Sequence, residues 1–474
     1  MASIKKTDKT HMDYAYDLDL VIRPDSTVPV LNREFGAFSG AGIPLFSIGG
    51  GVFRAVLSDI LVNFHARRGY FIADTPLIAS SNLFEVSGHL EFYRKNMFLF
   101  DIEGHDFAIK PMNCPYHILI FMHELARYRN KVKLPFKIFE VGRVHRYEPS
   151  GSLYGLLRVR GFTQDDAHII TPEDKAVDIV VDVFEEMKMI LENVFNLEVE
   201  TKDLHLRLSL SDKSLIGEEF MGTLNEWIGA ENVIEEAASI IEKKYDVSYS
   251  KEEGEAAFYG PKIDVVMRVK EAGIEKEWQL GTIQFDFNLP RRFRLYELVR
   301  ELYGDINIYI IHRALLGSIE RFLGVYLEHY RGRLPFSLAP LQIAIIGIKS
   351  GGDYDNVIED HAFTLANMLI NKGFRIGVKI TNKTWLSGDI RLLETTIKPP
   401  LLVFIGESEI KGKFVTLSMF SHNDMKRKKY RIIYRESFTE VLGELNSMIE
   451  ELESGIVKIA GQIPRIPMNL SHLL

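Results

Sequence analysis

The sequence predicts an α+β domain on an antiparallel sheet, followed by a smaller α/β domain. Up to residue 337, long helical patterns are interspersed with strands, whereas strands and helices alternate regularly from residue 338 onward. Between the two regions, Pro335 and Pro340 bracket a connector that precedes an apolar run. We therefore expect an N-terminal arm at 1–40, the first domain at 41–337, the second at 338–456 and a C-terminal tail at 457–474.

The composition excludes several classes of protein. With 46% hydrophobic and 26% charged residues among 474, the chain is globular rather than disordered. It has no apolar run near the roughly 18 residues of a membrane span and no N-terminal stretch typical of a secretion signal. The single cysteine, Cys114, excludes an internal disulfide and indicates a reducing, cytoplasmic location. A net charge of -8 argues against a protein that coats nucleic acid but permits a local basic surface.

In the first domain, two amphipathic helices and one strand have the clearest patterns. The segment GYFIADTPLI reads as a strand that reaches Pro76, and a second helix begins at Val177. The length between Ile170 and Ala257 reads as helices and short strands that continue this domain. Before the strand, a first helix is predicted by apolar residues at helical spacing: Val52, Phe53, Val56, Leu57, Ile60, Leu61 and Phe64.

The second domain alternates strands and helices, which predicts a largely parallel sheet. Its helices are DNVIEDHAFTLANMLINKG, closed by Gly373, and SFTEVLGELNSMIEELESG. The tail contains Pro464 and Pro467 and no sustained period, so we expect it to pack as an arm or to fray. The predicted strands are LQIAIIGI, FRIGVKI, LLVFIG and FVTLSMF.

The segment from Phe136 to Ile170 is the richest in functional groups. Its turn residues 149–152 separate two strand-like stretches, so we expect a long hairpin. A solvated outer face is the ordinary explanation of a polar strand, but six different groups in register, beside Arg146 and Glu148, favour a binding surface. Alternation along the returning strand places these six on one face: Arg158, Arg160, Phe162, Gln164, Asp166 and His168.

This hairpin resembles motif 2 of class II aminoacyl-tRNA synthetases, and HRYEPSGSLYGLLRVRGFTQDDAH is similar in particular to that of threonyl-tRNA synthetases. The helix and strand that end at Pro76 are similar to motif 1, and Gly317 to Arg321 are similar to motif 3. Further similar segments follow in the family's order: KPMNCPYH, AFYGPK, WQLGTIQFDF and IHRALLGSIERFLG. The resemblance implies a class II synthetase fold for the first domain and an anticodon-binding role for the second. It also implies the activity: threonine is activated with ATP to threonyl-adenylate and transferred to the 3′-OH of tRNA(Thr).

By this resemblance, Phe162 would stack on adenine and Glu148 would accept a hydrogen bond from its exocyclic amine. Arg146 would hold the α-phosphate, Arg158 the γ-phosphate, and Arg321 would reach the phosphates from the opposite side, since a planar guanidinium matches phosphate oxygens. Mg²⁺ would accompany ATP. The expected ATP-binding set is Arg146, Glu148, Arg158, Phe162, Gln279 and Arg321.

The expected catalytic residues are Arg146, Arg321 and His89. No general base is needed for activation, because the threonine carboxylate is already ionised. For the transfer step, the resemblance suggests that His89 orients or deprotonates the terminal ribose. A structural role for this loop histidine is an equally open interpretation.

The resemblance also implies one substrate-coordinating Zn²⁺ per subunit, bound by Cys114, His168 and His312. Spacing alone would make Cys114 a small buried hydrophobe and both histidines structural. A metal that coordinates the hydroxyl would reject valine, which shape alone separates from threonine by only about 1–3 kcal/mol. Asp166 would accept a hydrogen bond from that hydroxyl. The expected threonine-binding set is Met112, Gln164, Asp166, Tyr259, Lys262 and Gln284.

The residues that contact tRNA are harder to predict from the sequence than those of the ATP and threonine sites. The basic run at 426–431 could contact phosphates, or it could be a solvated loop. The strand FVTLSMF lacks the arginine expected for anticodon contact in bacterial-type relatives, and Glu409 fits a base-edge acceptor weakly. The candidate tRNA contacts are Glu409, Lys426, Arg427, Lys428 and Lys429.

Two other functions remain open at the level of sequence. One is a catalytically inactive synthetase paralogue that acts as a binding or regulatory subunit, although Arg146, Phe162, Arg321 and the three candidate zinc ligands argue against it. The other is a sister class IIa enzyme for serine or proline. ATP–pyrophosphate exchange with different amino acids separates these possibilities.

The resemblance implies two protein partners. Motif 1 forms the two-fold interface in class II enzymes, so we expect a homodimer through residues 52–76, although the same apolar stripe could pack within its own subunit. The resemblance begins about 40 residues from the start, which leaves no room for an N-terminal editing domain at the usual ~100–150 residues. We therefore expect serine to be misactivated and a separate protein to edit seryl-tRNA in trans.

Overall fold

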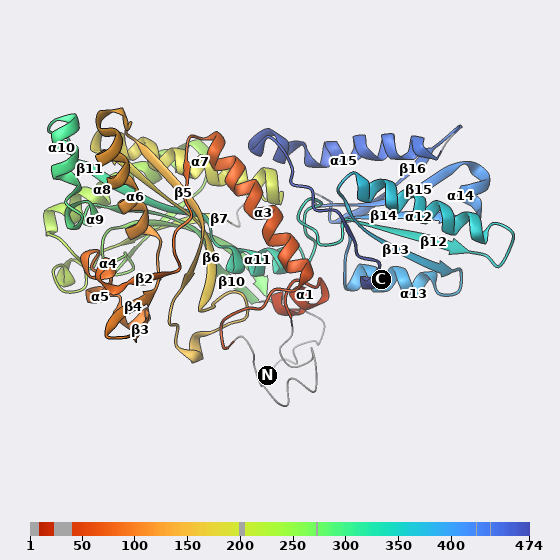
Figure 1. The fold of residues 1–474 in the computed structure, drawn as a ribbon, viewed down its shortest axis with the longest axis horizontal. Coiled ribbons are helices and arrows are strands. Elements are labelled where there is room, and N and C mark those ends of the chain that lie inside the picture. Colours follow the sequence, from red (N-terminus) through yellow and green to blue (C-terminus); the bar gives the residue numbers. More distant parts are fainter. Residues whose placement is uncertain (1–8, 23–39, 199–203, 272–273, 423, 437) are drawn as a thin grey trace.

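The computed structural model describes residues 9–22, 40–198, 204–271, 274–422, 424–436 and 438–474. Two units lie side by side along the long axis of the molecule (Figure 1). The larger one is built on an eight-stranded sheet and the smaller, at the C-terminal end, on a six-stranded sheet. This agrees with the predicted α+β domain followed by an α/β domain.

The large sheet has the strand order β1-β5-β6-β11-β10-β9-β7-β8. The pairs β1/β5 and β7/β8 are parallel, and the other neighbours are antiparallel. The predicted hairpin forms the pair β5/β6. The strands are β1 (Phe71–Ile72), β5 (Phe136–His145), β6 (Gly161–Pro172), β7 (Leu204–Leu210), β8 (Tyr249–Glu253), β9 (Lys262–Glu271), β10 (Ile274–Asp286) and β11 (Ile308–Ser318).

Helices pack on this sheet through the main hydrophobic core, which joins α3, α7, α8 and α11 to the strands. The apolar stripe predicted between Val52 and Phe64 is buried throughout, as expected for a helix packed on the core. The strand predicted to reach Pro76 is wrong in length: it ends at Ile72, and proline has no backbone N–H to continue a ladder. These helices are α3 (Ile48–Arg67), α7 (Ala176–Phe195), α8 (Leu224–Tyr245) and α11 (Ile319–His329).

A small three-stranded sheet, ordered β2-β4-β3, lies beside the large one with several short helices (Figure 1). Helix α6 begins at Cys114 and brings the KPMNCPYH segment against the large sheet. These elements are β2 (Ile78–Ser80), β3 (Phe98–Ile102), β4 (His105–Ile109), α4 (Ser81–Val86), α5 (His89–Phe92), α6 (Cys114–Tyr128), α9 (Leu289–Arg292) and α10 (Leu295–Tyr303).

The C-terminal sheet has the order β16-β15-β14-β12-β13-β17 and a parallel centre, as predicted. The basic run was expected in a loop or turn, but it forms the antiparallel edge strand β16. Six of its eight residues are exposed, which explains why no apolar alternation revealed this strand. The elements are β12 (Ile343–Lys349), α12 (Asp355–Asn371), β13 (Arg375–Asn382), α13 (Leu386–Thr395), β14 (Leu401–Gly406), α14 (Glu407–Gly412), β15 (Phe414–Ser421), β16 (Lys426–Ile433), α15 (Thr439–Ala460) and β17 (Met468–Asn469).

The C-terminal tail packs on its domain, and residues 9–22 of the N-terminal arm contain a short helix. Residues 457–460 continue α15, and β17 pairs in parallel with β13, which anchors the tail. In the arm, α1 (His11–Asp17) starts with a capping box between Thr10 and Asp13 and packs on α11. The rest of the arm, at 1–8 and 23–39, lies outside the described residues. Across the part of the chain that the structure describes, no helix is both long and apolar enough to span a membrane.

Candidate functional site

One cavity of about 440 Å³ contains most of the residues that the sequence predicted for ATP and threonine. Its walls come from β6, β9, β10, the loop after β5 and the β11–α11 junction. Asp166 is the one member of the two predicted sets that lies outside the lining. The predicted residues in the lining are Met112, Arg146, Glu148, Arg158, Phe162, Gln164, Tyr259, Lys262, Gln279, Gln284 and Arg321.

Strand register explains how residues so distant in sequence come together. Lys262 pairs with Gln284, Gln284 with His312, and His312 with His168 on four adjacent strands. The row therefore runs across the sheet from the cavity to the candidate metal ligands. Phe162, Gln164, Asp166 and His168 alternate along β6 as predicted, so they share one face.

Three arginines line the predicted ATP end of the cavity: Arg146, Arg158 and Arg321. Arg146 lies with its guanidinium carbon 5.1 Å from the centre of the Phe162 ring, and Arg321 Nε donates to the Leu157 carbonyl at 3.0 Å. Burial, followed by the charges of Arg146 and Arg158, lowers the pKa of Arg321. A polyanion would relieve this mutual repulsion.

Glu148 and Arg158 form an ion pair at the mouth of this cavity. Arg158 Nε and Nη2 donate to Glu148 Oε2 at 3.0 and 2.9 Å. Arg160 was predicted on the same face as Arg158, but it lies outside the cavity lining. Its Nε donates to the Glu148 carbonyl at 2.8 Å, and its guanidinium covers the Tyr147 ring. The strand begins only at Gly161, so strict alternation does not extend back to these arginines.

Asp264 is a buried residue, not predicted from the sequence, that contacts two of the predicted site residues. It is buried on β9, where its Oδ2 accepts from Lys262 Nζ at 2.7 Å and its Oδ1 accepts from Thr282 Oγ1 at 2.9 Å. Gln279 Nε2 donates to the same carboxylate at 2.5 Å. Asp264 therefore holds two predicted substrate residues in place. Its position two residues after Lys262, on the same strand face, was the available signal.

At the opposite end of the cavity, polar groups are held by neighbouring side chains. Tyr259 donates its hydroxyl to Gln284 Oε1 at 2.6 Å. Asp166 accepts from Asn113 Nδ2 at 2.8 Å, and burial raises the pKa of Asp166. Asn113 needs a glycine beside it, because a Cβ on Gly142 would lie 2.4 Å from Asn113 Nδ2.

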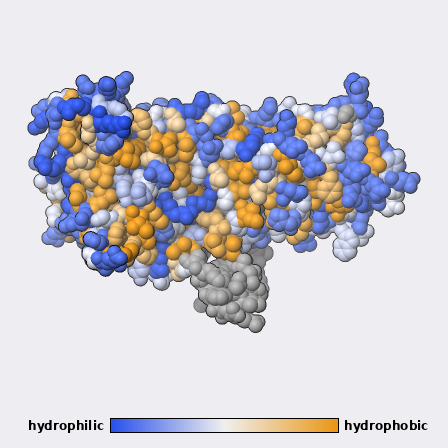
Figure 2. All heavy atoms as spheres, in the orientation of Figure 1, coloured by the Kyte–Doolittle hydropathy of each residue, from blue (hydrophilic) through white to orange (hydrophobic). Residues whose placement is uncertain are grey.

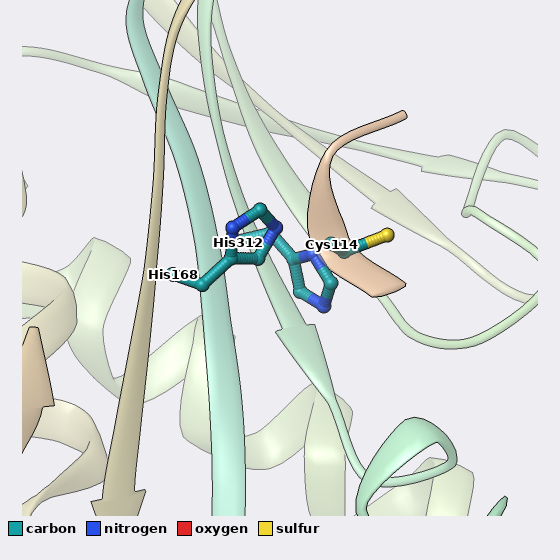
Figure 3. Close-up of side chains that lie close together, drawn as sticks. All are labelled: Cys114, His168 and His312. Atoms are coloured by element: carbon teal, nitrogen blue, oxygen red, sulfur yellow. The ribbon is translucent and has the colours of Figure 1, made fainter. Parts of the chain in front are cut away.

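Cys114, His168 and His312 converge from the start of α6 and two adjacent strands (Figure 3). Their candidate ligand atoms lie within 4.8 Å of one another, and all three residues are buried. A tetrahedral zinc holds such atoms about 3.3–3.6 Å apart, so binding would draw them together by on the order of 1 Å.

The chemistry of this donor set suits zinc. Burial, together with the nearby carboxyls of Asp166 and Asp286, raises the pKa of the Cys114 thiol, and a metal would favour the thiolate instead. His312 Nε2 lies 2.8 Å from Asp286 Oδ2, which leaves Nδ1 as the available ligand atom. Two nitrogens and one sulfur, with a cavity alongside, match a site that keeps a position for substrate.

His89 lies next to this cluster rather than in an open loop. It is buried, with Nε2 3.2 Å from Met112 Sδ and 3.9 Å from Cys114 Sγ, and Nδ1 2.8 Å from Ser87 Oγ. Burial, followed by the charges of His312, Arg146 and Arg292, lowers the pKa of His89 to about 3. It is therefore a neutral imidazole beside the predicted threonine end of the cavity.

The candidate tRNA residues differ in their surroundings. Lys426, Lys428 and Lys429 are exposed on β16, although Lys428 pairs with Asp424. Arg427 instead donates to the carbonyls of Pro399, Pro400 and Ser418 and pairs with Glu394. Its donors are thus used within the domain, contrary to the expected phosphate contact. Glu409 Oε1 accepts from Thr416 Oγ1 at 3.0 Å.

Comparisons of the sequence agree on one family. Residues 98–330 match the family described as the tRNA synthetase class II core domain (G, H, P, S and T). The chain is 60% identical over 467 residues to the threonine–tRNA ligase catalytic subunit of Aeropyrum pernix, covering 98% of this chain and 99% of that protein. It is 38% identical to the threonine–tRNA ligase of Borreliella afzelii, over 82% of this chain but only 63% of that protein's length.

Comparisons of the fold agree with those of the sequence. A crystal structure of a threonyl-tRNA synthetase from Aeropyrum pernix superimposes with a TM-score of 0.94 and covers 98% of this chain and 100% of that one. A threonyl-tRNA synthetase structure from Cryptosporidium parvum, 29% identical, gives a TM-score of 0.72 and covers 93% of this chain and 98% of that one. The prolyl-tRNA synthetase of Cryptosporidium parvum is 14% identical, covers 96% of this chain and 79% of that one, and shares the fold with a TM-score of 0.62.

Proposed function

The chain belongs to the threonine–tRNA ligases, a family of class II synthetases, and we propose which of its residues bind ATP, bind threonine and assist the transfer to tRNA. Threonine is activated by ATP in the 440 Å³ cavity and then passed to the 3′-OH of tRNA(Thr). The observation that carries this proposal is the convergence of eleven predicted substrate residues, from separate segments of the sequence, on a single cavity.

In the first step, the threonine carboxylate attacks the α-phosphorus of ATP in line and pyrophosphate leaves. Phe162 supplies a stacking surface for adenine, and Arg146, Arg158 and Arg321 neutralise the phosphates. Mg²⁺ enters with ATP and offsets charge on the leaving group. Rearrangement of the Glu148–Arg158 ion pair would free Arg158 for the γ-phosphate and Glu148 for the adenine amine.

Threonine would bind at the end of the cavity that adjoins Cys114, His168 and His312. These residues would hold Zn²⁺, which would supply a Lewis acid for the substrate's amino and hydroxyl groups. Asp166 lies 4.0 Å from His168 Nε2, where its carboxylate can accept from the threonine hydroxyl. Gln164 and Tyr259 would surround the amino group, and Lys262, Gln279 and Gln284 would complete the substrate pocket.

For transfer, we propose that His89 orients the terminal ribose toward the adenylate. Its contacts with Met112 and Cys114 place it beside the threonine end of the cavity, where the aminoacyl group would be transferred. Because His89 is buried, tRNA binding would have to expose its edge.

The test of the proposed function is ATP–pyrophosphate exchange dependent on threonine. We expect Arg146→Ala to lower kcat/KM by about 10²–10³, because it removes charge stabilisation of the transition state. Arg160→Ala is a matched control, since Arg160 lies in the same loop but outside the cavity. Equal effects of the two substitutions, or no exchange in the wild type, would contradict the assignment.

We further propose a homodimer through the motif 1 region. Phe71 is 60% exposed and Ile72 is 47% exposed, and both follow α3 in the chain. Hydrophobic residues also gather on the face of the larger unit that carries α3 (Figure 2). Light scattering should therefore give about twice the chain mass of 54.3 kDa, and Phe71→Asp should reduce it. A molar mass equal to that of one chain at every protein concentration would contradict this proposal.

The chemistry of the site predicts a need for editing. Serine has the same vicinal amino and hydroxyl groups as threonine and lacks one methyl, so discrimination should be only ~10–200-fold. The name "catalytic subunit" given to the Aeropyrum pernix relative supports a division of labour with a separate editing protein in trans. We expect purified enzyme to accumulate seryl-tRNA(Thr) when supplied with serine. Rapid deacylation of preformed seryl-tRNA(Thr) by this chain alone would show that it edits by itself.

A further inference from the structure

A chain of buried polar groups lies behind His168, on the side away from the cavity. His168 Nδ1 is 2.7 Å from His117 Nδ1, and His117 Nε2 is 3.1 Å from Glu140 Oε2. Glu140 Oε1 accepts from Lys110 Nζ at 2.9 Å, and Glu140 Oε2 accepts from Thr75 Oγ1 at 2.8 Å. We call His117, Glu140, Lys110 and Thr75 the relay. None of the four lines the substrate cavity.

The relay is costly to bury, which suggests that it serves more than packing. His117 is 0% exposed, Lys110 1% and Glu140 4%. A buried Lys–Glu pair loses hydration that its mutual attraction barely offsets, and apolar residues of similar volume commonly stabilise a core as well or better. Here the pair is neutral as a unit, and it is connected through His117 to a candidate metal ligand.

Hydrogen-bond direction along the relay fixes the proton positions. Glu140 already accepts from Lys110 and Thr75, so its Oε2 faces His117 Nε2 as an acceptor and His117 must carry its proton there. Because Lys110 already balances the charge of Glu140, we infer that His117 is neutral; it then has one N–H, and its Nδ1 is an acceptor. The short contact to His168 Nδ1 requires a donor, and that proton must belong to His168.

We propose that His117, backed by Glu140 and Lys110, is a positioning residue that keeps the proton of His168 on Nδ1 and so leaves Nε2 free to bind zinc. This inference rests on the zinc site of the proposed function. The geometry is consistent at the other nitrogen, because His168 Nε2 lies on the Asp166 side of the ring.

The two histidine ligands therefore present different ring nitrogens to the metal. His312 meets a carboxylate directly, with Nε2 2.8 Å from Asp286 Oδ2, and offers Nδ1. Asp286 is itself held, since its Oδ1 accepts from the backbone N–H groups of Asn288 and Leu289. His168 meets its carboxylate through the intervening His117 and offers Nε2. Loss of such supporting partners typically weakens metal binding 10–100-fold.

The experiment compares His117→Phe with His117→Gln and uses Zn²⁺ and Co²⁺ as probes. Zinc affinity is measured by competition with a chromophoric chelator, and ligand geometry by the visible absorption bands of the Co²⁺-substituted protein. We expect His117→Phe to weaken zinc binding 10–100-fold and to alter the Co²⁺ bands. His117→Gln should restore most of the affinity, because its amide oxygen can accept from His168 Nδ1.

His65→Phe is the matched control for the loss of a buried imidazole. His65 is also fully buried, but it donates to the Leu61 carbonyl and stacks on Phe139, away from the metal ligands. We expect it to lower thermal stability without changing zinc affinity or the Co²⁺ bands. Should His117→Phe fail to fold, Glu140→Gln keeps the shape of the relay and removes its charge, and we expect a several-fold loss of affinity.

The outcomes separate this inference from the proposed function. If the wild type binds no zinc, the zinc proposal fails and the inference fails with it. If the wild type binds zinc and the foldable relay variants match it in affinity and Co²⁺ spectrum, the inference alone is overturned. A drop in affinity that His65→Phe reproduces would likewise assign the effect to general destabilisation and overturn it.

Discussion

Asp165 and Asp166 illustrate how one residue of strand register separates framework from function. Asp165 is fully buried and accepts from the backbone N–H groups of Leu315 and Leu316, at 2.8 and 3.0 Å. Burial raises the pKa of Asp165 to about 7. Asp166 points to the opposite face, toward Asn113 and the candidate zinc ligands. The two carboxylates therefore have different consequences when removed.

We expect Asp166→Ala to lower kcat/KM for threonine activation by about 10–10², since a buried hydrogen bond to the substrate is worth on the order of 1.5–3 kcal/mol when charged. Valine activation should fall less, because valine has no hydroxyl to lose. Asp165→Ala is the contrast: it leaves two buried N–H groups unpaired and should lower stability. Parallel losses for threonine and valine in Asp166→Ala would contradict the assigned role.

Glu140 predicts a pH dependence of stability. Burial raises the pKa of this carboxyl, but hydrogen bonds from His117, Lys110 and Thr75 outweigh burial and bring it down from 4.5 to about 2. The ionised form therefore stabilises the fold fully above about pH 4.5, and this contribution is lost as the pH falls through about 2. We expect the difference in unfolding free energy between wild type and Glu140→Gln, on the order of 2 kcal/mol at pH 6, to shrink between pH 4.5 and 2. Chelator-treated protein should be used, and a difference that grows toward low pH would contradict the prediction.

At the level of single residues, the sequence could indicate the substrate groups but not what holds them. Gln164, Asp166 and His168 were readable because polar groups on one strand face break the apolar pattern of a buried strand. The only signal for Asp264 was its position two residues after Lys262, because sheet register brings its partners on β10 to it. The relay was not readable, since its members come from elements that are distant in the sequence. The prediction that Arg160 shares a face with Phe162 was wrong because the strand starts only at Gly161, after Arg160.

Among the elements, α3 connects the proposed dimer interface to the substrate cavity. Arg54 Nη1 donates to Glu320 Oε1 at 2.6 Å and Nη2 donates to Thr163 Oγ1, while Glu320 Oε2 accepts from the Thr163 N–H at 2.8 Å. Thr163 lies between Phe162 and Gln164, both in the cavity lining. One cluster therefore ties motif 1 to motifs 2 and 3.

Arg54→Ala should raise the KM for ATP several-fold and lower stability by about 3 kcal/mol, because the buried Glu320 carboxylate loses its cation. Arg67→Ala is the matched control on the same helix, since Arg67 is exposed and far from this cluster. Exchange kinetics and denaturant unfolding measure the two effects. An unchanged KM in a destabilised Arg54→Ala protein would restrict Arg54 to a structural role.

The exposed lysines of the edge strand β16 allow a test of whether this element binds tRNA phosphates. Reversing the exposed charges with Lys426→Glu and Lys429→Glu should weaken tRNA binding and reduce the salt dependence of log Kd by about 2, with threonine-dependent exchange unchanged. Arg427→Ala should instead lower stability, since it removes the donor that joins the carbonyls of Pro399, Pro400 and Ser418 and the ion pair with Glu394. If the double reversal leaves tRNA affinity and its salt slope intact, this edge does not contact phosphate.

For the whole molecule, periodicity was sufficient to predict two domains and a largely parallel second sheet, because long buried segments have clear patterns. It was insufficient for β16 and β17, which are edge strands with little apolar alternation. It was likewise insufficient for α1, whose stability comes from its cap and from packing on α11. Edges and ends depend on tertiary contacts, and these are absent from local sequence.

We propose that a metal-centred site in this chain recognises the hydroxyl of threonine rather than the shape of its side chain. The measurement that tests this is the ratio of kcat/KM for threonine to that for valine in ATP–pyrophosphate exchange. A site that binds the hydroxyl should give a ratio of about 10⁴ or more, because valine leaves its polar groups unpaired. A ratio of about 10² or less, as for a pocket that distinguishes isosteres by fit alone, would contradict the account.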